Sequence, residues 1–470
     1  MQVFSSNLSR MGWYDIDFGW GIPEFCRTSF YETLNDFPIL AGNLEQTKNK
    51  QLQVIIDKDD LNLPDYKETQ CDVHFDTLKA AKYSAAVLPE NAATADSFVI
   101  ENSNKKIKLA NIHVLRLRDN SGVALFVGVP HFVVDGTGFV EFMKRWSAVC
   151  ACVNSQGVQA NIPDYTASHD RLDLEINFPE KPALFDGRSE STYIPGGIRS
   201  RWIAGISPQS RGKLLTRLAS LMHVNNARYY LSRQKLQALR LSIQDHVPGG
   251  QRMSDNSLIM TLVSIVTAQS LGTPHTMSLP TRILAKLRQS IGELLGIPPK
   301  LFSTVMAVNT RPRLKRYTEA TRYCGNAAYT LAVPNRLENF QAPATPEMLA
   351  KVAASINDGV RDADEMHVRN FMDLFSSAPD YYMRAMFYDK QRNRMAFSSN
   401  LSRMGWYNVD FGWGIPEFVT FADGHIMPIT LILPAHPSLD GYIVHTMFSK
   451  KQDAFFKEST LWTETAEIFC

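Results

Sequence analysis

The sequence predicts an α/β fold, and three observations support this class. An unbroken apolar run from Val123 to Val129 is typical of a strand that is buried on both faces. The segment from Phe139 to Val149 repeats apolar residues at the spacing of one helix face. Strand-like and helix-like patterns then alternate along the rest of the chain, as they do in α/β proteins.

The chain before this central strand predicts one more helix and two more strands. Residues Tyr31 to Phe37 have the helical pattern, and the alternation at Leu52 to Ile56 and at Ile107 to Leu117 predicts the strands. Beyond the central strand and its helix, residues 154 to 201 are polar and rich in Pro, Gly, Asp and Ser. We interpret this stretch as a loop and as the boundary between two domains.

The second half of the chain repeats the alternation. Ser254 and Asp255 are suitable N-cap residues for the apolar helix that follows them. The predicted elements are a strand at Ala227 to Leu231, helices at Arg233 to Ile243 and Leu258 to Leu271, a strand at Val305 to Val308, a helix at Met348 to Val360, and strands at Ile429 to Leu433 and Tyr442 to Phe448.

Composition excludes several classes of function. The 470 residues are enough for two or three domains, and 49 Lys+Arg against 47 Asp+Glu leave no basic footprint for nucleic acid. The N-terminus lacks the pattern of a secretory signal, and the apolar segment Leu258 to Val266 is too short to span a bilayer. The six cysteines form no Cys-x-x-Cys pair, so neither a zinc site nor a disulfide framework is indicated. We expect a cytoplasmic protein with no bound metal, no nucleic-acid partner and no membrane span.

His131 is the main candidate for chemistry. It lies at the carboxyl end of the predicted central strand, in a His-x-x-x-Asp-Gly stretch that includes Asp135 and Gly136 and leads into the helix. Open α/β sheets tend to bind ligands at this end of their strands. A core histidine that is hydrogen-bonded to the backbone is the alternative that this window leaves open.

The same six-residue pattern recurs from His436 to Gly441. There the histidine lies between Pro434 and Pro437, and apolar runs flank it on both sides. Proline and Asp-Gly between two strand patterns indicate a hairpin loop. We therefore interpret His436 as part of a surface turn.

A nearly exact duplication is the most unusual feature of the chain. Residues Phe4 to Phe25 match Phe397 to Phe418 at 20 of 22 positions. Repeat architectures use whole supersecondary units in at least three copies. The pair is therefore a recent duplication or an error of gene assembly, and not a solenoid.

Several familiar motifs do not occur in the sequence. Phosphate-binding loops of the Gly-x-x-x-x-Gly-Lys-Ser/Thr and Gly-x-Gly-x-x-Gly types are missing, as are Gly-x-Ser-x-Gly and His-Glu-x-x-His. An Asp-Phe-Gly begins at Asp410, but the other kinase motifs do not accompany it. The aromatic residues around it, Trp406, Tyr407, Phe411 and Trp413, are more typical of packing than of nucleotide stacking.

Four stretches together resemble the BAHD acyltransferases. The His-x-x-x-Asp-Gly from His131 to Gly136 precedes an Asp-Phe-Gly-Trp-Gly from Asp410 to Gly414 in the order of that family. Between them, Asn309 to Leu314 and Tyr323 to Asn326 are similar to a third conserved region. Phe37 to Gly42 is similar to the family's Tyr-Pro-Leu-Ala-Gly segment, so the resemblance extends from about residue 30 to the end.

The resemblance implies two similar lobes, each with a mixed sheet flanked by helices, and an active-site channel at their interface. The first lobe would comprise residues 1–200, the crossover 201–225 and the second lobe 226–470, with 395–420 adding to the first lobe's sheet. Relatives transfer an acyl group from acyl-CoA, a co-substrate, to a small-molecule alcohol or amine, and we expect a monomer without a bound cofactor.

The resemblance also implies roles for single residues. His131 would be the general base, without an acyl-enzyme, and Asp135 would turn away from the substrate and pair with Arg311. A base of this kind contributes roughly 10²–10⁴-fold to the rate. The residues expected to be structural are Asp135, Gly136, Arg311, Asp410, Gly412, Trp413 and Gly414.

Ser399 and Asn400 are possible oxyanion or substrate contacts. They match positions where relatives often carry Ser/Thr-x-Trp, and Leu401 replaces the tryptophan and lacks its indole N–H. An ordinary serine at a strand edge is the alternative for Ser399. The residues that meet the CoA phosphates are not indicated by the sequence.

The duplicate raises a further question, because relatives have an N-terminal strand where this chain has residues 4–25. We expect residues 397–418 to keep the common binding pocket and the N-terminal copy to be loosely packed or disordered. A non-catalytic or impaired relative is therefore one alternative function. A condensation-type amide former is another, although such proteins usually have a second histidine where this chain has Pro130.

Overall fold

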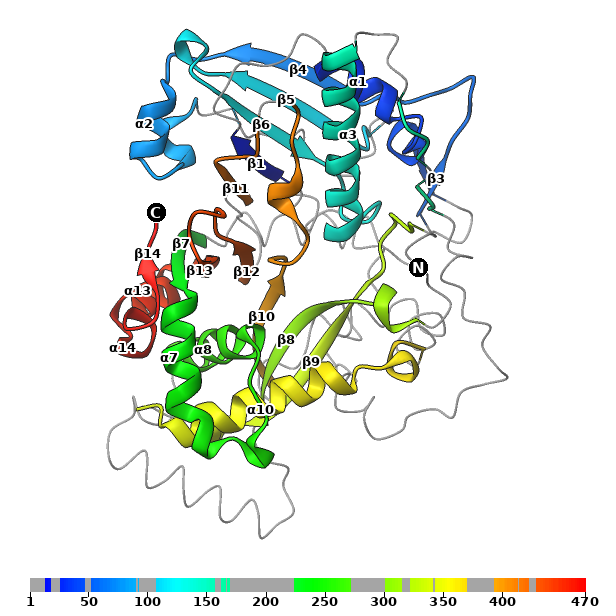
Figure 1. The fold of residues 1–470 in the computed structure, drawn as a ribbon. Helices are drawn as coiled ribbons and strands as arrows, with labels where there is room; N and C mark the ends of the chain where they lie inside the picture. Colours follow the sequence, from blue (N-terminus) through cyan, green and yellow to red (C-terminus); the bar gives the residue numbers. More distant parts are fainter. Residues whose placement is uncertain are drawn as a thin grey trace.

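The computed structural model consists of two lobes, each with a mixed β-sheet (Figure 1). The structure describes residues 13–17, 26–46, 52–89, 92, 107–156, 162–165, 167–169, 224–271, 301–314, 322–340, 343–369, 393–412, 414–421 and 428–470. The expected crossover at 201–225 lies outside these residues except for its last two.

The first lobe contains a five-stranded sheet in the order β11-β1-β6-β5-β4. All neighbours are antiparallel except β4 and β5, which are parallel. Every residue of β6 is buried, which confirms the prediction of a central strand covered on both faces. The strands are β1 (Trp13–Asp17), β4 (Asp65–Gln70), β5 (Asn111–Arg116), β6 (Val123–Gly128) and β11 (Phe418–Phe421).

Two helices, α1 (Cys26–Thr33) and α3 (Gly136–Gln156), pack together beside this sheet (Figure 1). The indole N–H of Trp146 donates to the carbonyl of Cys26 at 3.2 Å, which joins the two helices. The helix predicted at residues 31–37 ends early, at Thr33, because the residues before Pro38 are biased away from helical geometry. The lobe also contains α2 (Phe75–Ala80) and a hairpin of β2 (Asn43–Gln46) and β3 (Leu52–Ile55).

The second lobe contains a seven-stranded sheet in the order β14-β7-β13-β12-β10-β8-β9. Strand β10 is parallel to both of its neighbours, and the other pairs are antiparallel. Its strands are β7 (Val224–Ser232), β8 (Leu301–Asn309), β9 (Ala328–Arg336), β10 (Asn393–Asn400), β12 (Ile429–Pro434), β13 (Gly441–Ser449) and β14 (Glu467–Ile468).

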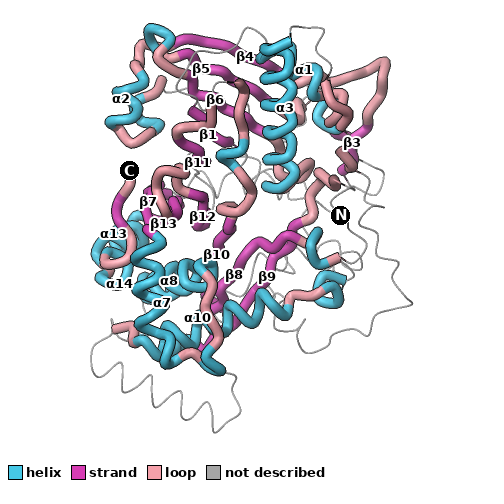
Figure 2. Tube along the Cα trace, in the orientation of Figure 1, coloured by secondary structure: helices cyan, strands magenta, loops and turns pink. Residues whose placement is uncertain are grey.

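Helix α8 (Asp255–Ser270) forms the centre of the second lobe's core and is almost wholly buried. The Ser254 hydroxyl accepts from the Ser257 N–H, which confirms the predicted N-cap. The helix predicted at Arg233 to Ile243 is α7 (Arg233–Ile243), with Ser232 as its cap. Helices α10 (Pro346–Asp362), α13 (Lys450–Glu458) and α14 (Thr460–Thr463) complete the lobe (Figure 2).

The segment from β10 to β12 links the two lobes. Strand β10 lies in the second sheet, the following loop reaches α3 of the first lobe, β11 joins the first sheet, and β12 returns to the second. The expectation that residues 395–420 add to the first sheet was therefore wrong for β10 and right only for β11. The reason is that β10 has a parallel partner on each side, β8 and β12, within the second sheet.

The described part of the N-terminal copy also differs from expectation. Residues 13–17 form β1, which inserts between β6 and β11 and pairs with both. The expected loose packing was wrong for these five residues, because β1 satisfies the backbone groups of two strand edges at once. The remainder of the copy, residues 4–12 and 18–25, lies outside the described residues.

Within the described ranges, no helix combines the length and the apolar character that crossing a bilayer requires. The same ranges contain no group of three or more His, Cys, Asp or Glu side chains arranged to hold a metal ion. All six cysteines are free thiols.

Candidate active site

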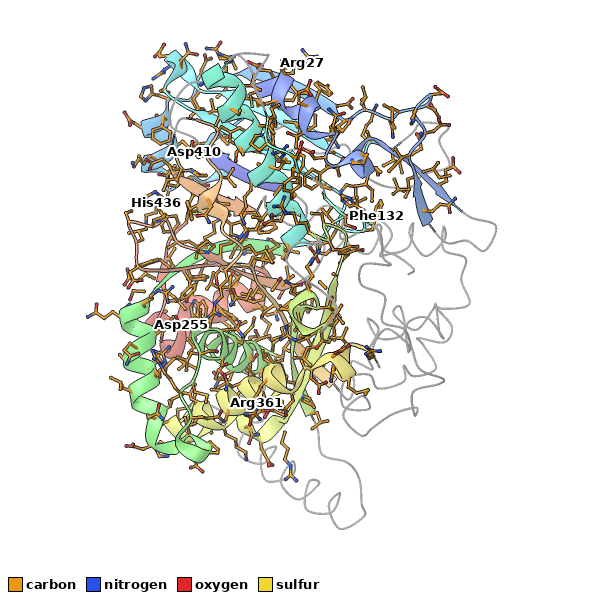
Figure 3. The ribbon with its side chains drawn as sticks, turned by 45° about the vertical axis from the view of Figure 1, so that its right-hand side comes forward. Arg27, Phe132, Asp255, Arg361, Asp410 and His436 are labelled. Atoms are coloured by element: carbon orange, nitrogen blue, oxygen red, sulfur yellow. The ribbon has the colours of Figure 1, made fainter. Side chains whose placement is uncertain are left out.

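His131 lies in the turn between β6 and α3, on the side of the first lobe that faces the second. The Val133 N–H donates to the carbonyl of Pro130 at 2.8 Å and closes the turn. His131 is half-buried, whereas Val133 and Val134 are buried in the core. The neighbouring Phe132 lies at the level where the two lobes meet (Figure 3). The imidazole is thus accessible at the interface while the turn beneath it is anchored.

Asp135 anchors the turn through a buried ion pair with Arg311 of the second lobe. The Arg311 Nη1 is 2.7 Å from Asp135 Oδ2, and Nη2 is 3.2 Å from Oδ1. The two side chains are only 4% and 2% exposed. The carboxylate also accepts from the backbone N–H groups of Gly138 and Ala327, at 2.9 and 2.8 Å. Its charge is therefore compensated by four donors, which is what burial of a carboxylate requires.

Arg311 connects this ion pair to the segment that precedes β9. Its Nε donates to the carbonyl of Tyr323 at 2.8 Å, and its Nη2 donates to that of Gly325 at 2.6 Å. The backbone of α3 approaches this segment so closely that a Cβ at Gly138 would lie 2.0 Å from the carbonyl oxygen of Cys324. Only glycine is compatible with this contact, so Gly138, two residues after the motif, is a packing requirement.

Cys324 is the thiol nearest this network, and it is buried. Burial raises the pKa of the Cys324 thiol to about 12. A thiol that stays protonated at neutral pH is a poor nucleophile. This side chain is therefore unsuited to carrying an acyl group.

Asn326 contacts His131 directly from the second lobe. Its Nδ2 donates to the His131 carbonyl at 2.8 Å and lies 3.3 Å from the ring Nδ1. Sequence reasoning included Asn326 only as part of a conserved stretch and assigned it no role. The sequence signal for this contact is that Asn326 directly follows Gly325. A residue at that position can contact the His131 turn, which the hydrogen bonds of Arg311 hold in place.

The two residues expected to contact an oxyanion have different environments. On β10, Phe397 belongs to the core cluster shared by both lobes, and Ala396 belongs to the cluster around α8. Because neighbouring strand residues point to opposite faces, Ser399 lies on the interface face with Phe397. Its strand partner Leu431 belongs to the same interface cluster. Ser399 is half-buried there.

Asn400 is hydrogen-bonded within the second lobe. Its Nδ2 donates to Asn256 Oδ1 at 2.7 Å, and its Oδ1 accepts from the backbone and hydroxyl of Ser402 at 3.0 and 2.7 Å. These bonds connect the loop after β10 to the first turn of α8. Whether Asn400 also donates to an oxyanion stays a prediction, because Nδ2 has a second N–H besides the one that Asn256 accepts.

The Asp-Phe-Gly stretch is held by its own hydrogen bonds and by packing against α3. Asp410 Oδ1 accepts from the N–H groups of Gly412 and Gly414 at 2.8 and 2.9 Å. Both glycines have positive φ, at 101° and 114°, which favours glycine. Phe411 is fully buried and packs edge-on against Trp146 of α3 at 4.9 Å between ring centroids. Trp413 lies outside the described residues.

A polar cavity of about 330 Å³ opens beside the N-terminus of α8. It is lined by Arg240, Arg252, Met253, Ser254, Asp255 and Arg403. Arg403 belongs to the loop after β10, and the neighbouring Met404 in that loop approaches Gly136 in the turn of the His motif. The same loop therefore borders both the cavity and the His131 turn.

The charge balance of this cavity is positive. Asp255, visible on the second lobe in Figure 3, is bonded to Arg240, to Arg233 at 2.9 Å and to the Tyr442 hydroxyl at 2.7 Å. Burial raises the pKa of this carboxyl, but the hydrogen bonds from Tyr442 and Arg240 outweigh that effect and the pKa is lowered overall. The acidic side chain is thus neutralised locally. Arg252 and Arg403 are exposed and contribute positive charge beside a helix N-terminus, which favours anions.

His436 lies in the hairpin loop between β12 and β13, as predicted. Its Nδ1 is 2.7 Å from the Ser438 hydroxyl, and Asp440 is exposed. The Leu439 N–H donates to the His436 carbonyl at 2.7 Å and closes the turn. The structure therefore separates two copies of one pattern into an anchored interface turn and a surface loop.

The fold is similar to that of several solved structures. F. graminearum TRI101 complexed with coenzyme A and deoxynivalenol superimposes with a TM-score of 0.68 at 12% identity, over 100% of both chains. Vinorine synthase superimposes with a TM-score of 0.58 at 14% identity, over 100% of this chain and 95% of that one. A condensation domain of the CDA synthetase has a TM-score of 0.56 at 11% identity, over 99% of this chain and 93% of that one. At these identities the similarity establishes the fold alone.

Sequence comparison then identifies the family. The profile of the Transferase family matches residues 24–162 and 297–461, more than half of the chain, so the protein belongs to this family of BAHD-type acyltransferases. The O-acetyltransferase pboB of Aspergillus ustus is 25% identical over 349 residues, 69% of this chain. Deacetylvindoline O-acetyltransferase of Catharanthus roseus is 25% identical over 359 residues, 73% of this chain. The matches span 64% and 66% of these two relatives.

Proposed function

We propose that this protein is an acyl-CoA-dependent O-acyltransferase with His131 as its general base. The observation that carries the proposal is a half-buried imidazole at the lobe interface, on a turn locked by the Asp135–Arg311 ion pair. A neutral imidazole near pH 7 is matched to taking a proton from a hydroxyl. The O-acetyltransferase names of two relatives support an alcohol as acceptor.

The proposed reaction needs no covalent enzyme intermediate. His131 takes the proton of the acceptor hydroxyl as its oxygen attacks the thioester carbonyl and forms the new C–O bond. The tetrahedral intermediate then breaks its C–S bond, and the imidazolium returns the proton to the departing thiolate. The products are an ester and free CoA. The high pKa of the Cys324 thiol is consistent with a direct transfer.

Ser399 is the proposed donor to the oxyanion of the intermediate. It lies on the interface face of β10, and a hydroxyl can donate one hydrogen bond. Replacing Ser399 with Ala should lower kcat by about 10²-fold or less and leave the KM for acyl-CoA unchanged. Unchanged kcat would assign Ser399 to the strand alone.

The arginine-lined cavity is the proposed site for the phosphates of CoA. Arg252 and Arg403 supply positive charge, and the N-terminus of α8 supplies backbone N–H groups. The loop that carries Arg403 also borders the His131 turn, so one ligand could extend from the cavity to the imidazole.

Thiol release tests the base. The protein is mixed with acetyl-CoA and a panel of alcohols, and free thiol is titrated. Replacing His131 with Ala should lower kcat by roughly 10²–10⁴-fold. The same change at His436 is the matched control and should leave the rate unchanged, since His436 lies in a surface loop. Thiol release that persists in the His131 variant would overturn the proposal.

Ligand-induced stabilisation tests the phosphate site. Thermal unfolding is followed with CoA, dephospho-CoA and pantetheine, because a ligand that binds the folded state raises Tm. We expect stabilisation to fall along this series in the wild type. Combined Arg252→Ala and Arg403→Ala changes should weaken CoA binding by about tenfold or more and remove the dependence on phosphate. Arg361, on α10 and away from the cavity (Figure 3), is the control. An unchanged affinity for CoA in the double variant would place the phosphates elsewhere.

A further inference from the structure

One amide of the second lobe contacts two parts of His131. The Asn326 Nδ2 is 2.8 Å from the His131 carbonyl oxygen and 3.3 Å from the ring Nδ1. A carbonyl can only accept, so the amide donates to it, whatever the tautomer of the ring. The amide nitrogen can also donate to the ring Nδ1, but only when that ring nitrogen carries no proton. The two contacts together restrain both the backbone and the rotation of the imidazole.

The amide itself has a defined orientation. Asn326 Oδ1 accepts from the N–H of Ala328 at 3.4 Å, on the opposite side of the side chain from His131. Exchanging the amide oxygen and nitrogen would place one oxygen against another at the His131 carbonyl. The hydrogen bonds at both ends therefore select the orientation in which nitrogen faces His131.

The backbone on both sides of Asn326 is held by the buried ion pair. Arg311 Nη2 donates to the carbonyl of Gly325 at 2.6 Å, and the N–H of Ala327 donates to Asp135 Oδ2 at 2.8 Å. The carbonyl of Ala327 accepts from the N–H and the hydroxyl of Thr310 at 2.8 and 2.7 Å. The ion pair thus fixes the backbone on both sides of Asn326, and the Asn326 side chain contacts His131 from this fixed position.

We propose that Asn326 is a positioning residue for acyl transfer, which sets the orientation of His131 from the opposite lobe. The inference rests on the proposed role of His131 as base. The Asp135–Arg311 pair would then have a second role besides anchoring the turn, because it holds the backbone on both sides of Asn326. A displacement of about 1 Å in a catalytic group can cost about 10²-fold in rate. Loss of the amide should therefore lower kcat and leave the binding of both substrates unaffected.

Two substitutions of Asn326 distinguish the loss of its hydrogen bond to His131 from the effect of a charge beside the ring. Asn326→Ala removes the donor, and we expect kcat to fall by about 10²-fold with unchanged KM values and an unchanged pH profile. Asn326→Asp keeps the shape but presents oxygen to both contacts. We expect kcat to fall as well, and the acidic limb of the pH profile to move to higher pH, because a carboxylate beside Nδ1 favours the protonated ring. The concentration of folded enzyme is measured by CoA-binding stoichiometry, so that partial unfolding does not enter kcat.

Asn335→Ala is the matched control. Asn335 is a buried asparagine of the second lobe, whereas Asn326 is half-buried, and the Asn335 Nδ2 bonds to Ser355 at 3.2 Å. It should lose stability without changing kcat per folded molecule. Wild-type kcat in both Asn326 variants, or a loss that falls entirely on KM, would overturn the inference while leaving His131 as base. Full activity in His131→Ala would instead remove the proposed function itself.

Discussion

The chain contains His-x-x-x-Asp-Gly twice, and the two copies have opposite environments. Asp135 and its partner Arg311 are 4% and 2% exposed, whereas Asp440 and its partner Arg233 are 80% and 52% exposed. Both acids have an arginine within ion-pair distance, at 2.7 and 2.8 Å. The shortest contact is nearly the same length, but Asp135 is buried and has four donors, whereas Asp440 is exposed to water.

This difference decides what each pair does. An exposed pair is screened by water and contributes about 0–1 kcal/mol. A buried pair must have all its partners, because a buried charge left alone costs several kcal/mol. The first copy can therefore lock a turn between two lobes, while the second ends a hairpin.

Breaking the buried pair should have the largest effect. Asp135→Ala leaves Arg311 buried without its carboxylate, and we expect the free energy of unfolding to fall by about 3–5 kcal/mol. Chemical denaturation of the purified protein measures this. A loss below about 1 kcal/mol would mean that the interface is hydrated and that the two copies are equivalent.

Replacing both members of the buried pair sharpens the comparison. Asp135→Leu combined with Arg311→Met removes both charges, so the double variant should recover much of the stability lost by either change alone. The activity should remain low, because the Leu and Met side chains cannot hold Gly325 and Ala327 beside Asn326. Recovery of both stability and activity would show that the pair serves packing only.

Close backbone packing distinguishes Gly136, the last residue of the first copy, from Gly138, two residues after it. Gly138→Ala would place a Cβ 2.0 Å from a backbone oxygen, so we expect a loss of about 1–3 kcal/mol. Gly136→Ala meets only the flexible ends of Met404 and Leu401, at 3.1 Å or more, and should change stability by about 0.5 kcal/mol or less. Urea midpoints of the two variants provide the test, and equal midpoints would contradict it.

The exposed pair should give the smallest effect. Asp440→Asn is expected to change stability by less than about 1 kcal/mol at low ionic strength, because Asp440 and Arg233 are both exposed. In about 1 M salt the difference should vanish, since the Debye length is then about 3 Å. A loss of several kcal/mol that persists in salt would place this pair with the buried one.

Much of the fold could be predicted because its signals are local. The run from Val123, the helix at Arg233 to Ile243 and the cap at Ser254 each follow from residues within one turn or one strand of each other. The position of His131 after the central strand follows in the same way. Helix ends were less accurate, as at Thr33, because capping and proline geometry compete with periodicity there.

The rest of the site depends on contacts between distant segments. The Asn400 side chain donates to Asn256 in the first turn of α8, 144 positions away in the chain. Asn326 lies 195 positions from His131 in the chain and reaches it only through the Arg311 network. The arginines of the cavity come from α7, the loop before α8 and the loop after β10, and no sequence pattern unites them.

The duplicated segment shows the limit of local information most directly. Residues 13–17 form a strand, while the matching residues 406–410, which differ at Asn408 and Val409, begin with a 3₁₀ turn that packs its aromatic side chains into the core. The sequence by itself determined the α/β class, the elements with a clear period and the histidine turn. The tertiary structure alone decided which copy became a strand, which acid was buried and which amide met the histidine. Hydrogen-bond partners and the exclusion of water come from other parts of the chain, so closely similar segments acquire different structures and different roles.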